Sequence, residues 1–114
     1  MSSPGDVEIT VEPLSQGGSM ISVRGELDLS SVDDLGSALA RGERGQDLVV
    51  DLTRCTFIDS SAIRTLLVGV ADLESAGGRV AVVAQSDGVR RTLEIAGVHE
   101  RLAIHPSLDA ALLG

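Results

Sequence analysis

The stretch Val49–Leu67, which reads VVDLTRCTFIDSSAIRTLL, decides the fold because it joins a buried strand to a helix. The run Leu48–Leu52 is almost wholly apolar, as is typical of a central strand that is covered on both faces. After Asp59-Ser60-Ser61, apolar residues recur at the spacing of one helix face until Gly77-Gly78, namely Ile63, Leu66, Leu67, Val70 and Leu73. The stretch therefore predicts a strand, a loop, and a helix that begins at Asp59-Ser60-Ser61.

The flanking sequence repeats this alternation of strands and helices. Alternating apolar residues at 6–12 and a short apolar run at 20–23, separated by a glycine-containing turn at 13–19, predict an opening hairpin. Arg24–Asp28 is expected to leave the second strand, and a helix is expected from the candidate caps Ser30 and Ser31 to Arg41-Gly42. Strands are also expected at 80–84 and 102–104, and helices at 89–96 and 106–113.

These elements predict a single α/β domain over residues 1–114, with a disordered N-terminus at 1–5. Repeated strand–helix units favour a parallel sheet with helix cover, and the hairpin makes the sheet mixed. We expect a mostly parallel sheet of about 4–5 strands covered by about four helices.

Charge and composition exclude several classes of function. The chain carries 17 acidic and 9 basic residues, so phosphate backbones would repel it and nucleic acid is not expected as a partner. Every basic residue is arginine, which rules out a Walker-type lysine and a Schiff-base lysine. The single cysteine, the lack of a signal-peptide pattern and the lack of an apolar run of ~18 residues predict a cytoplasmic protein without direct membrane insertion.

Three features together resemble the STAS domain, the fold of bacterial anti-sigma factor antagonists and of sulfate-transporter tails. They are Gly25-Glu26-Leu27-Asp28 after the second strand, the strand that leads to Asp59-Ser60-Ser61, and Gly77-Gly78 before the next strand. The resemblance covers nearly the whole chain. It implies a protein-binding switch in bacterial transcription that is not an enzyme and that uses no cofactor or metal.

The resemblance also implies a role for Ser60. In this family, a kinase that is itself the anti-sigma factor phosphorylates the serine directly after the aspartate, which is Ser60 here. The unphosphorylated form binds this kinase and frees the sigma factor, the phosphorylated form is released, and a serine phosphatase resets the switch. A helix N-terminus suits a phosphate because its free N–H groups favour an anion. On spacing alone, Ser60 would be interpreted as an ordinary N-cap.

Residues near Ser60 are candidate partner contacts. The resemblance implies that Asp28 contacts the partner, and the alternative is a solvated loop acid. Asp59 either caps the helix or orients the Ser60 hydroxyl, and Ser61 is a second candidate cap. We assign to the predicted partner-binding surface Asp28, Asp59, Ser60, Ser61, Ile63 and Arg64.

The sequence departs from the family pattern after Ser61, where Ala62-Ile63-Arg64 replaces the usual Gly, aliphatic, Gly. Arg64 follows Ser60 by four residues, so the two lie on the same face of the helix. Arg64 could meet an acidic group of the kinase, pair with phosphorylated Ser60, or be an ordinary solvated arginine.

Other functions fit the sequence less well. A second hypothesis is a STAS domain that serves as an accessory subunit of a membrane lipid transporter or as a small-anion sensor, without phosphorylation. A hydrolase would need a G-x-S-x-G elbow, and His99 and His105 match no zinc spacing. Cys55 is expected to be a semi-buried loop residue. A response-regulator receiver would need an active-site lysine, and this sequence has none. A nucleotide-binding fold would need a glycine-rich loop after a strand, which is also absent. We therefore expect the partner, and not this chain, to bind ATP.

Overall fold

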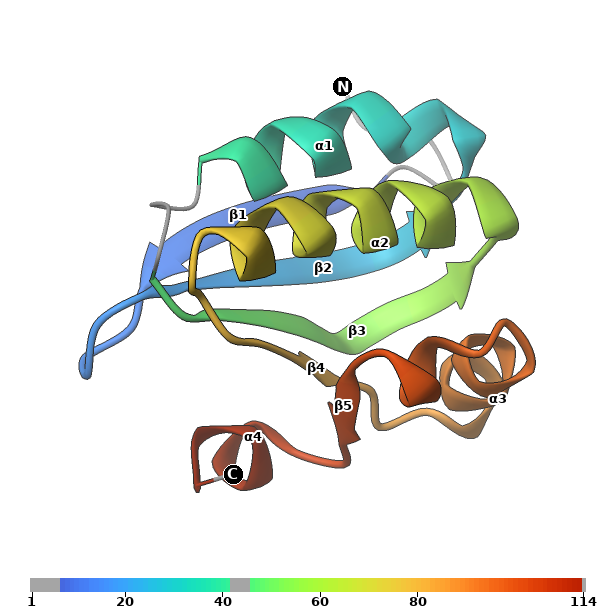
Figure 1. The fold of residues 1–114 in the computed structure, drawn as a ribbon. Coiled ribbons are helices and arrows are strands. Elements are labelled where there is room, and N and C mark those ends of the chain that lie inside the picture. Colours follow the sequence, from blue (N-terminus) through green and yellow to red (C-terminus); the bar gives the residue numbers. More distant parts are fainter. Residues whose placement is uncertain (1–6, 42–45, 114) are drawn as a thin grey trace.

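The computed structural model describes residues 7–41 and 46–113 (Figure 1). Its elements are, in order, β1 (Glu8–Pro13), β2 (Ser19–Leu27), the 3₁₀ turn η1 (Leu29–Ser31), α1 (Val32–Ala40), β3 (Leu48–Ile58), α2 (Ser60–Ser75), β4 (Val80–Val83), α3 (Asp87–Ile95), the 3₁₀ turn η2 (Val98–Glu100), β5 (Ala103–His105) and α4 (Leu108–Leu113). The predicted α/β alternation is confirmed. The expected disordered segment 1–5 and Gly42 lie outside the described residues.

The five strands form one mixed sheet in the order β1-β2-β3-β4-β5. The opening hairpin is antiparallel, and every later neighbour pair is parallel, as the sequence predicts. The turn of the hairpin depends on Gly18, whose φ is +89° and whose added Cβ would lie 2.2 Å from the carbonyl oxygen of Asp47. The turn packs so closely against the backbone just before β3 that only glycine fits at position 18.

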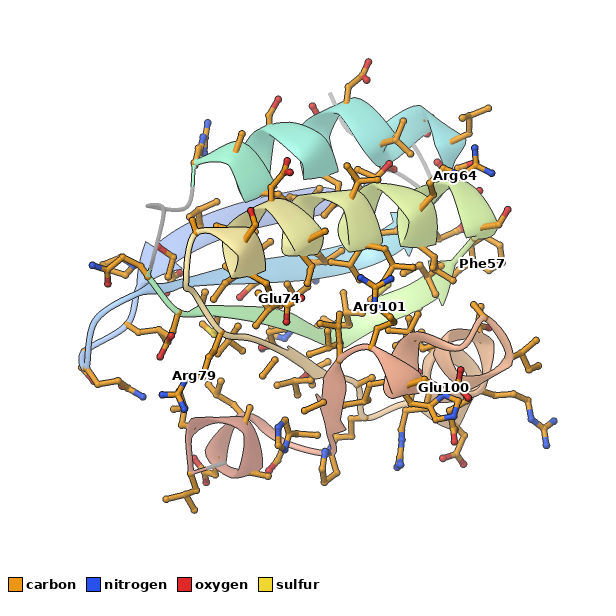
Figure 2. The ribbon with its side chains drawn as sticks, in the orientation of Figure 1. Phe57, Arg64, Glu74, Arg79, Glu100 and Arg101 are labelled. Atoms are coloured by element: carbon orange, nitrogen blue, oxygen red, sulfur yellow. The ribbon has the colours of Figure 1, made fainter. Side chains whose placement is uncertain are left out.

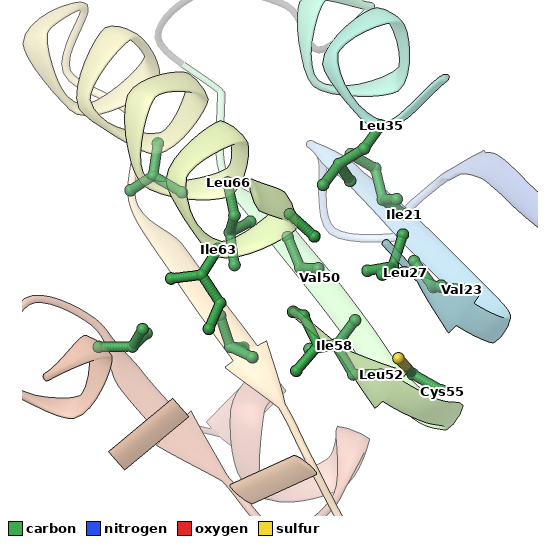
Figure 3. Packing of buried hydrophobic residues seen from close by; sticks show 14 of the residues in the cluster. Ile21, Val23, Leu27, Leu35, Val50, Leu52, Cys55, Ile58, Ile63 and Leu66 are labelled. Atoms are coloured by element: carbon green, nitrogen blue, oxygen red, sulfur yellow. The ribbon is translucent and has the colours of Figure 1, made fainter. Parts of the chain in front are cut away.

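One face of the sheet carries the main hydrophobic core. Helices α1 and α2 lie side by side over this face (Figure 1), and α3 contributes Val89 and Leu93 to the same cluster. Figure 3 shows Leu66 of α2 packed over Val50 of β3, next to Ile21 of β2. The core is aliphatic because the only aromatic residue, Phe57, is 50% exposed. Each fully buried leucine or isoleucine stabilises the fold by roughly 1.5–3 kcal/mol.

The opposite face of the sheet is covered only in part. Val49 and Val83 pack there against Ala111 of α4, which confirms cover on both faces at this point of β3. Farther along β3, however, Asp51 is half-buried and borders a depression lined by polar groups of three strands: Glu8, Thr10, Glu12, Ser22, Arg24, Thr53 and Arg54. The expectation that residues 48–52 are covered on both faces is therefore wrong at Asp51.

Two strands continue beyond the points at which the sequence indicates a loop. β2 runs through Gly25 to Leu27, and β3 runs to Ile58. The two strands are paired along this extension with register shifts, and Gly25 has a φ of +103°. Cys55 is therefore a strand residue that is 1% exposed, not a semi-buried loop residue. Burial raises the pKa of its thiol, which donates to the carbonyl oxygen of Phe57 across 3.2 Å.

Candidate functional site

The connection after β2 and the connection after β3 meet at one end of the molecule. The Asp59 N–H donates to the carbonyl oxygen of Leu27 across 3.0 Å, and the Leu29 N–H donates to Oδ2 of Asp59 across 3.2 Å. The carboxyl ends of neighbouring parallel strands share one edge, which explains this proximity. The structure thus brings Asp28 and Asp59 to the same edge, as the sequence predicts.

Asp59 is the N-cap of α2. Its Oδ1 accepts from the Ala62 N–H across 3.0 Å, and its backbone carbonyl accepts from the Ile63 N–H across 3.0 Å. The side-chain bond satisfies the Ala62 N–H, one of the four N–H groups that a helix start leaves without partners, and the carbonyl bond is the first intrahelical bond of α2. Of the two roles open from the sequence, the structure shows capping. The bond from Leu29 adds a cross-link between the two connections that the sequence did not predict.

Asp28 holds the turn between β2 and α1. Its Oδ1 accepts from the Ser30 N–H across 3.0 Å, from the Ser30 hydroxyl, and from the Ser31 hydroxyl across 3.3 Å. The hydroxyl of Ser30 is the main cause that lowers the pKa of the Asp28 carboxyl. The expected capping by Ser30 and Ser31 is wrong: Ser31, at the N-cap position of α1, makes no side-chain cap bond, and both hydroxyls donate to Asp28.

Ser60 and Arg64 are both exposed, on the first two turns of α2. They line one shallow depression together with Leu29, Val32, Ser61 and Thr65. Figure 2 shows Arg64 at the end of the molecule where α2 begins, close to the start of α1. Among the described residues, no group accepts a hydrogen bond from the Ser60 hydroxyl. Ser61 is half-buried, so Ser60 is the more accessible of the two serines.

Ile63 does not belong to this surface. Its side chain is 5% exposed and packs in the core, where Figure 3 shows it on the sheet-facing side of α2. The prediction that Ile63 takes part in a partner-binding surface therefore has no exposed side chain to support it. The helical spacing of apolar residues in α2 already placed Ile63 on the buried face, and this pattern predicts its position better than its closeness to Ser60 in the sequence.

Two exposed apolar side chains near Ser60 were missed by the sequence analysis. Leu29 is 69% exposed and lines the depression of Ser60, and Val68 is 61% exposed and lines a groove between α1 and α2. Arg64 and Thr65 line both hollows, so the depression and the groove share one border. Val68 carried a weak signal, because it interrupts the polar side of α2, whereas no pattern marks Leu29.

The chemistry available at this end of the molecule is that of an accessible hydroxyl. Within residues 7–41 and 46–113, no three His, Cys, Asp or Glu side chains are grouped so as to hold a metal ion. No helix in these ranges is both long and apolar enough to cross a membrane. The exposed hydroxyl of Ser60 and the exposed guanidinium of Arg64 are the polar groups that this depression offers to solvent.

Comparison with known proteins shows what the chain is similar to. The family model of the STAS domain matches residues 10–111. An anti-sigma factor antagonist from Mycobacterium paratuberculosis has a TM-score of 0.85 and 29% identity, over 99% of this chain and 97% of its own. SpoIIAA, an anti-sigma factor antagonist, has a TM-score of 0.72 and 22% identity in its unphosphorylated form, over 92% of this chain and 93% of its own.

The STAS fold also occurs inside a larger protein of different function. The murine anion transporter Slc26a9 has a TM-score of 0.72 and 21% identity, over 83% of this chain but only 17% of the transporter. The family match covers nearly all of the described elements, and the mixed sheet with its helices agrees with it. The chain belongs to the STAS domain family.

Proposed function

We propose that this chain is a cytoplasmic bacterial anti-sigma factor antagonist whose binding to an anti-sigma factor is switched off by phosphorylation of Ser60. The observation that carries the proposal is the exposed position of Ser60 on the first turn of α2, directly after the capping carboxylate of Asp59. The likeness to two anti-sigma factor antagonists supports it. A structure of Bacillus SpoIIAA in its phosphorylated form, at 19% identity and a TM-score of 0.69, gives further support, because that protein has a similar fold.

The proposed reaction takes place on the partner, which binds the ATP. The Ser60 oxygen attacks the γ-phosphorus, an O–P bond forms, the bond from the γ-phosphorus to the oxygen of the ADP leaving group breaks, and the hydroxyl proton passes to a base of the kinase. Ser60 is suited to this role because its hydroxyl faces solvent and is not occupied by a neighbouring acceptor among the described residues. The chain itself catalyses nothing, and a serine phosphatase reverses the modification by hydrolysis.

The energy required for the switch is modest. A phosphate adds a charge of about −1.5 to −2 at one position, within a chain whose formal charge is already −8. In a closely packed interface, that charge costs space and desolvation. A difference of about 3 kcal/mol in binding free energy would weaken the complex over 100-fold, without any refolding of the chain.

The experiment that tests the proposal is incubation with ATP and each candidate kinase, followed by intact-mass measurement and phosphosite mapping. We expect one added phosphate on the wild-type chain and on Ser61→Ala, and none on Ser60→Ala. Ser61→Ala is the matched control because it removes the adjacent, half-buried hydroxyl. Modification of Ser60→Ala to the wild-type level, or no modification of wild type by the cognate kinase, would contradict the proposal.

A second function is favoured by the likeness to Slc26a9, whose STAS region lies within an anion transporter. In that case, this chain would be an accessory subunit of a membrane lipid transporter or a small-anion sensor, without phosphate turnover. The same experiment separates the two functions, because only the switch requires Ser60 to be modified.

A further inference from the structure

The charge around Ser60 is strongly unbalanced. The carboxylate of Asp59 lies on the preceding residue, and the carboxylate of Asp28 belongs to the connection that is bonded to Asp59. Asp33 and Asp34 add two exposed acids in the first turn of α1, which follows the Leu29–Ser31 turn in the chain. A phosphate on Ser60 would therefore enter a region that already contains several negative charges.

The N-terminus of α2 is already partly occupied by the Asp59 carboxylate. The Asp59 side chain already occupies the Ala62 N–H, and the Ile63 N–H makes the first intrahelical bond, to the Asp59 carbonyl oxygen. One donor that the helix would otherwise offer to an anion is therefore taken, and a carboxylate already lies at the positive end of the helix. A positively charged side chain nearby would add to the stabilisation that the helix start still offers to a phosphate.

Arg64 is the one cationic residue among those that line the depression of Ser60. It follows Ser60 by four residues on α2, and side chains at this spacing lie about 5–6 Å apart at their Cβ atoms. Arg64 is exposed, and the only ion pair within 4.0 Å in the described part of the chain joins Arg79 to Asp47. The Arg64 guanidinium is therefore free to turn toward Ser60.

We propose that Arg64 is an internal phosphate clamp, which binds the phosphate of phosphorylated Ser60 through two parallel N–H donors. The inference rests on the proposed phosphorylation of Ser60, and it adds a way in which the modified state is stabilised. Arginine suits this contact because its planar guanidinium can donate to two phosphate oxygens at once. Because Arg64 also borders the groove between α1 and α2, the phosphate would draw its side chain away from that groove.

The test uses protein in which phosphoserine is installed at position 60 during synthesis, so that no kinase is needed. The second pKa of the phosphate is measured by ³¹P NMR titration in the wild-type background and in Arg64→Gln, Arg64→Lys and Arg91→Gln. A nearby cation favours the dianion, so we expect the phosphate pKa to be higher in Arg64→Gln by about 0.15–0.4 units. Arg64→Lys should restore part of the difference, because it keeps the charge without the paired donors.

Arg91→Gln is the matched control, because it removes the same charge from an exposed position on α3. Its phosphate pKa should equal the wild-type value. Equal phosphate pKa values in wild type and Arg64→Gln would overturn the clamp, as would an equal rise in Arg91→Gln. Neither outcome would affect the proposed function, which fails separately if the cognate kinase leaves Ser60 unmodified.

Discussion

Two pairs of polar residues at one end of the molecule differ in how their side chains are used. The carboxylates of Asp28 and Asp59 accept hydrogen bonds from the chain itself, and together they fix the turn before α1 and the start of α2. Ser60 and Arg64, on the first two turns of α2, are exposed and line an open depression. Asp28 and Asp59 thus hold the local backbone in place, whereas the side chains of Ser60 and Arg64 are exposed and available for contacts.

This difference has a direct consequence for mutagenesis. Removing one of the acids should lower the stability of the fold and distort the site at the same time. Removing Ser60 or Arg64 should leave the fold intact and change only what a partner or a phosphate meets. Measurements of unfolding and binding can therefore separate the two pairs.

The largest effect on stability is expected for Asp59→Ala. This change removes the N-cap of α2 and the cross-link to Leu29, so we expect the free energy of unfolding in urea to fall by about 1–2 kcal/mol. Asp72→Ala, on the exposed side of the same helix, is the control and should stay within about 0.5 kcal/mol of wild type. An Asp59→Ala protein as stable as the control would mean that Asp59 is not a structural residue.

A smaller and pH-dependent effect is expected for Asp28→Asn. The pKa of the Asp28 carboxyl is lowered in the folded state, below its ordinary value of 3.8. The ionised carboxylate therefore adds stability above pH 3.8, and that contribution is lost as the pH falls through the folded-state pKa. Urea unfolding of both proteins should show wild type more stable at pH 7 and the gap closing on acidification. Asp72→Asn is the control for the loss of an exposed acid. If the difference in the free energy of unfolding between wild type and Asp28→Asn does not change with pH relative to this control, the ionised Asp28 carboxylate does not stabilise the fold.

The smallest effect on stability is expected for Ser60→Ala. The hydroxyl of Ser60 is exposed and makes no described contact that holds the fold, so the free energy of unfolding should change by no more than about 0.5 kcal/mol. The same protein should bind the anti-sigma factor without being released by ATP. A large fall in the free energy of unfolding of Ser60→Ala would show that Ser60 is a structural residue, like Asp28 and Asp59.

Much of the fold follows from local patterns in the sequence. The alternation in residues 8–12, the apolar stripe of α2 and the glycines after it each report on their own element, and they agree with the structure. The end of β3 could not be predicted in this way. Thr53, Arg54, Thr56 and Phe57 are exposed, and the register shifts against β2 break the strict alternation that marks a strand.

The position of the site could be predicted from the sequence, but the hydrogen bonds within it could not. Strand–loop–helix order placed Asp59 and Ser60 at the start of α2, and strand adjacency placed Asp28 near them. The bond between Leu29 and Asp59 joins residues 30 positions apart, so no local pattern reports it. The exposure of Leu29 likewise depends on how the turn before α1 sits on α2, which only the tertiary structure determines.

The most direct test of the central claim is the affinity of the cognate anti-sigma factor for two forms of this chain, measured by titration calorimetry. One form carries serine at position 60, and the other carries phosphoserine installed there during synthesis. We expect the phosphorylated form to bind at least about 100-fold more weakly, because the added charge must be desolvated in the interface. Equal affinities of the two forms would contradict the claim that Ser60 controls the switch.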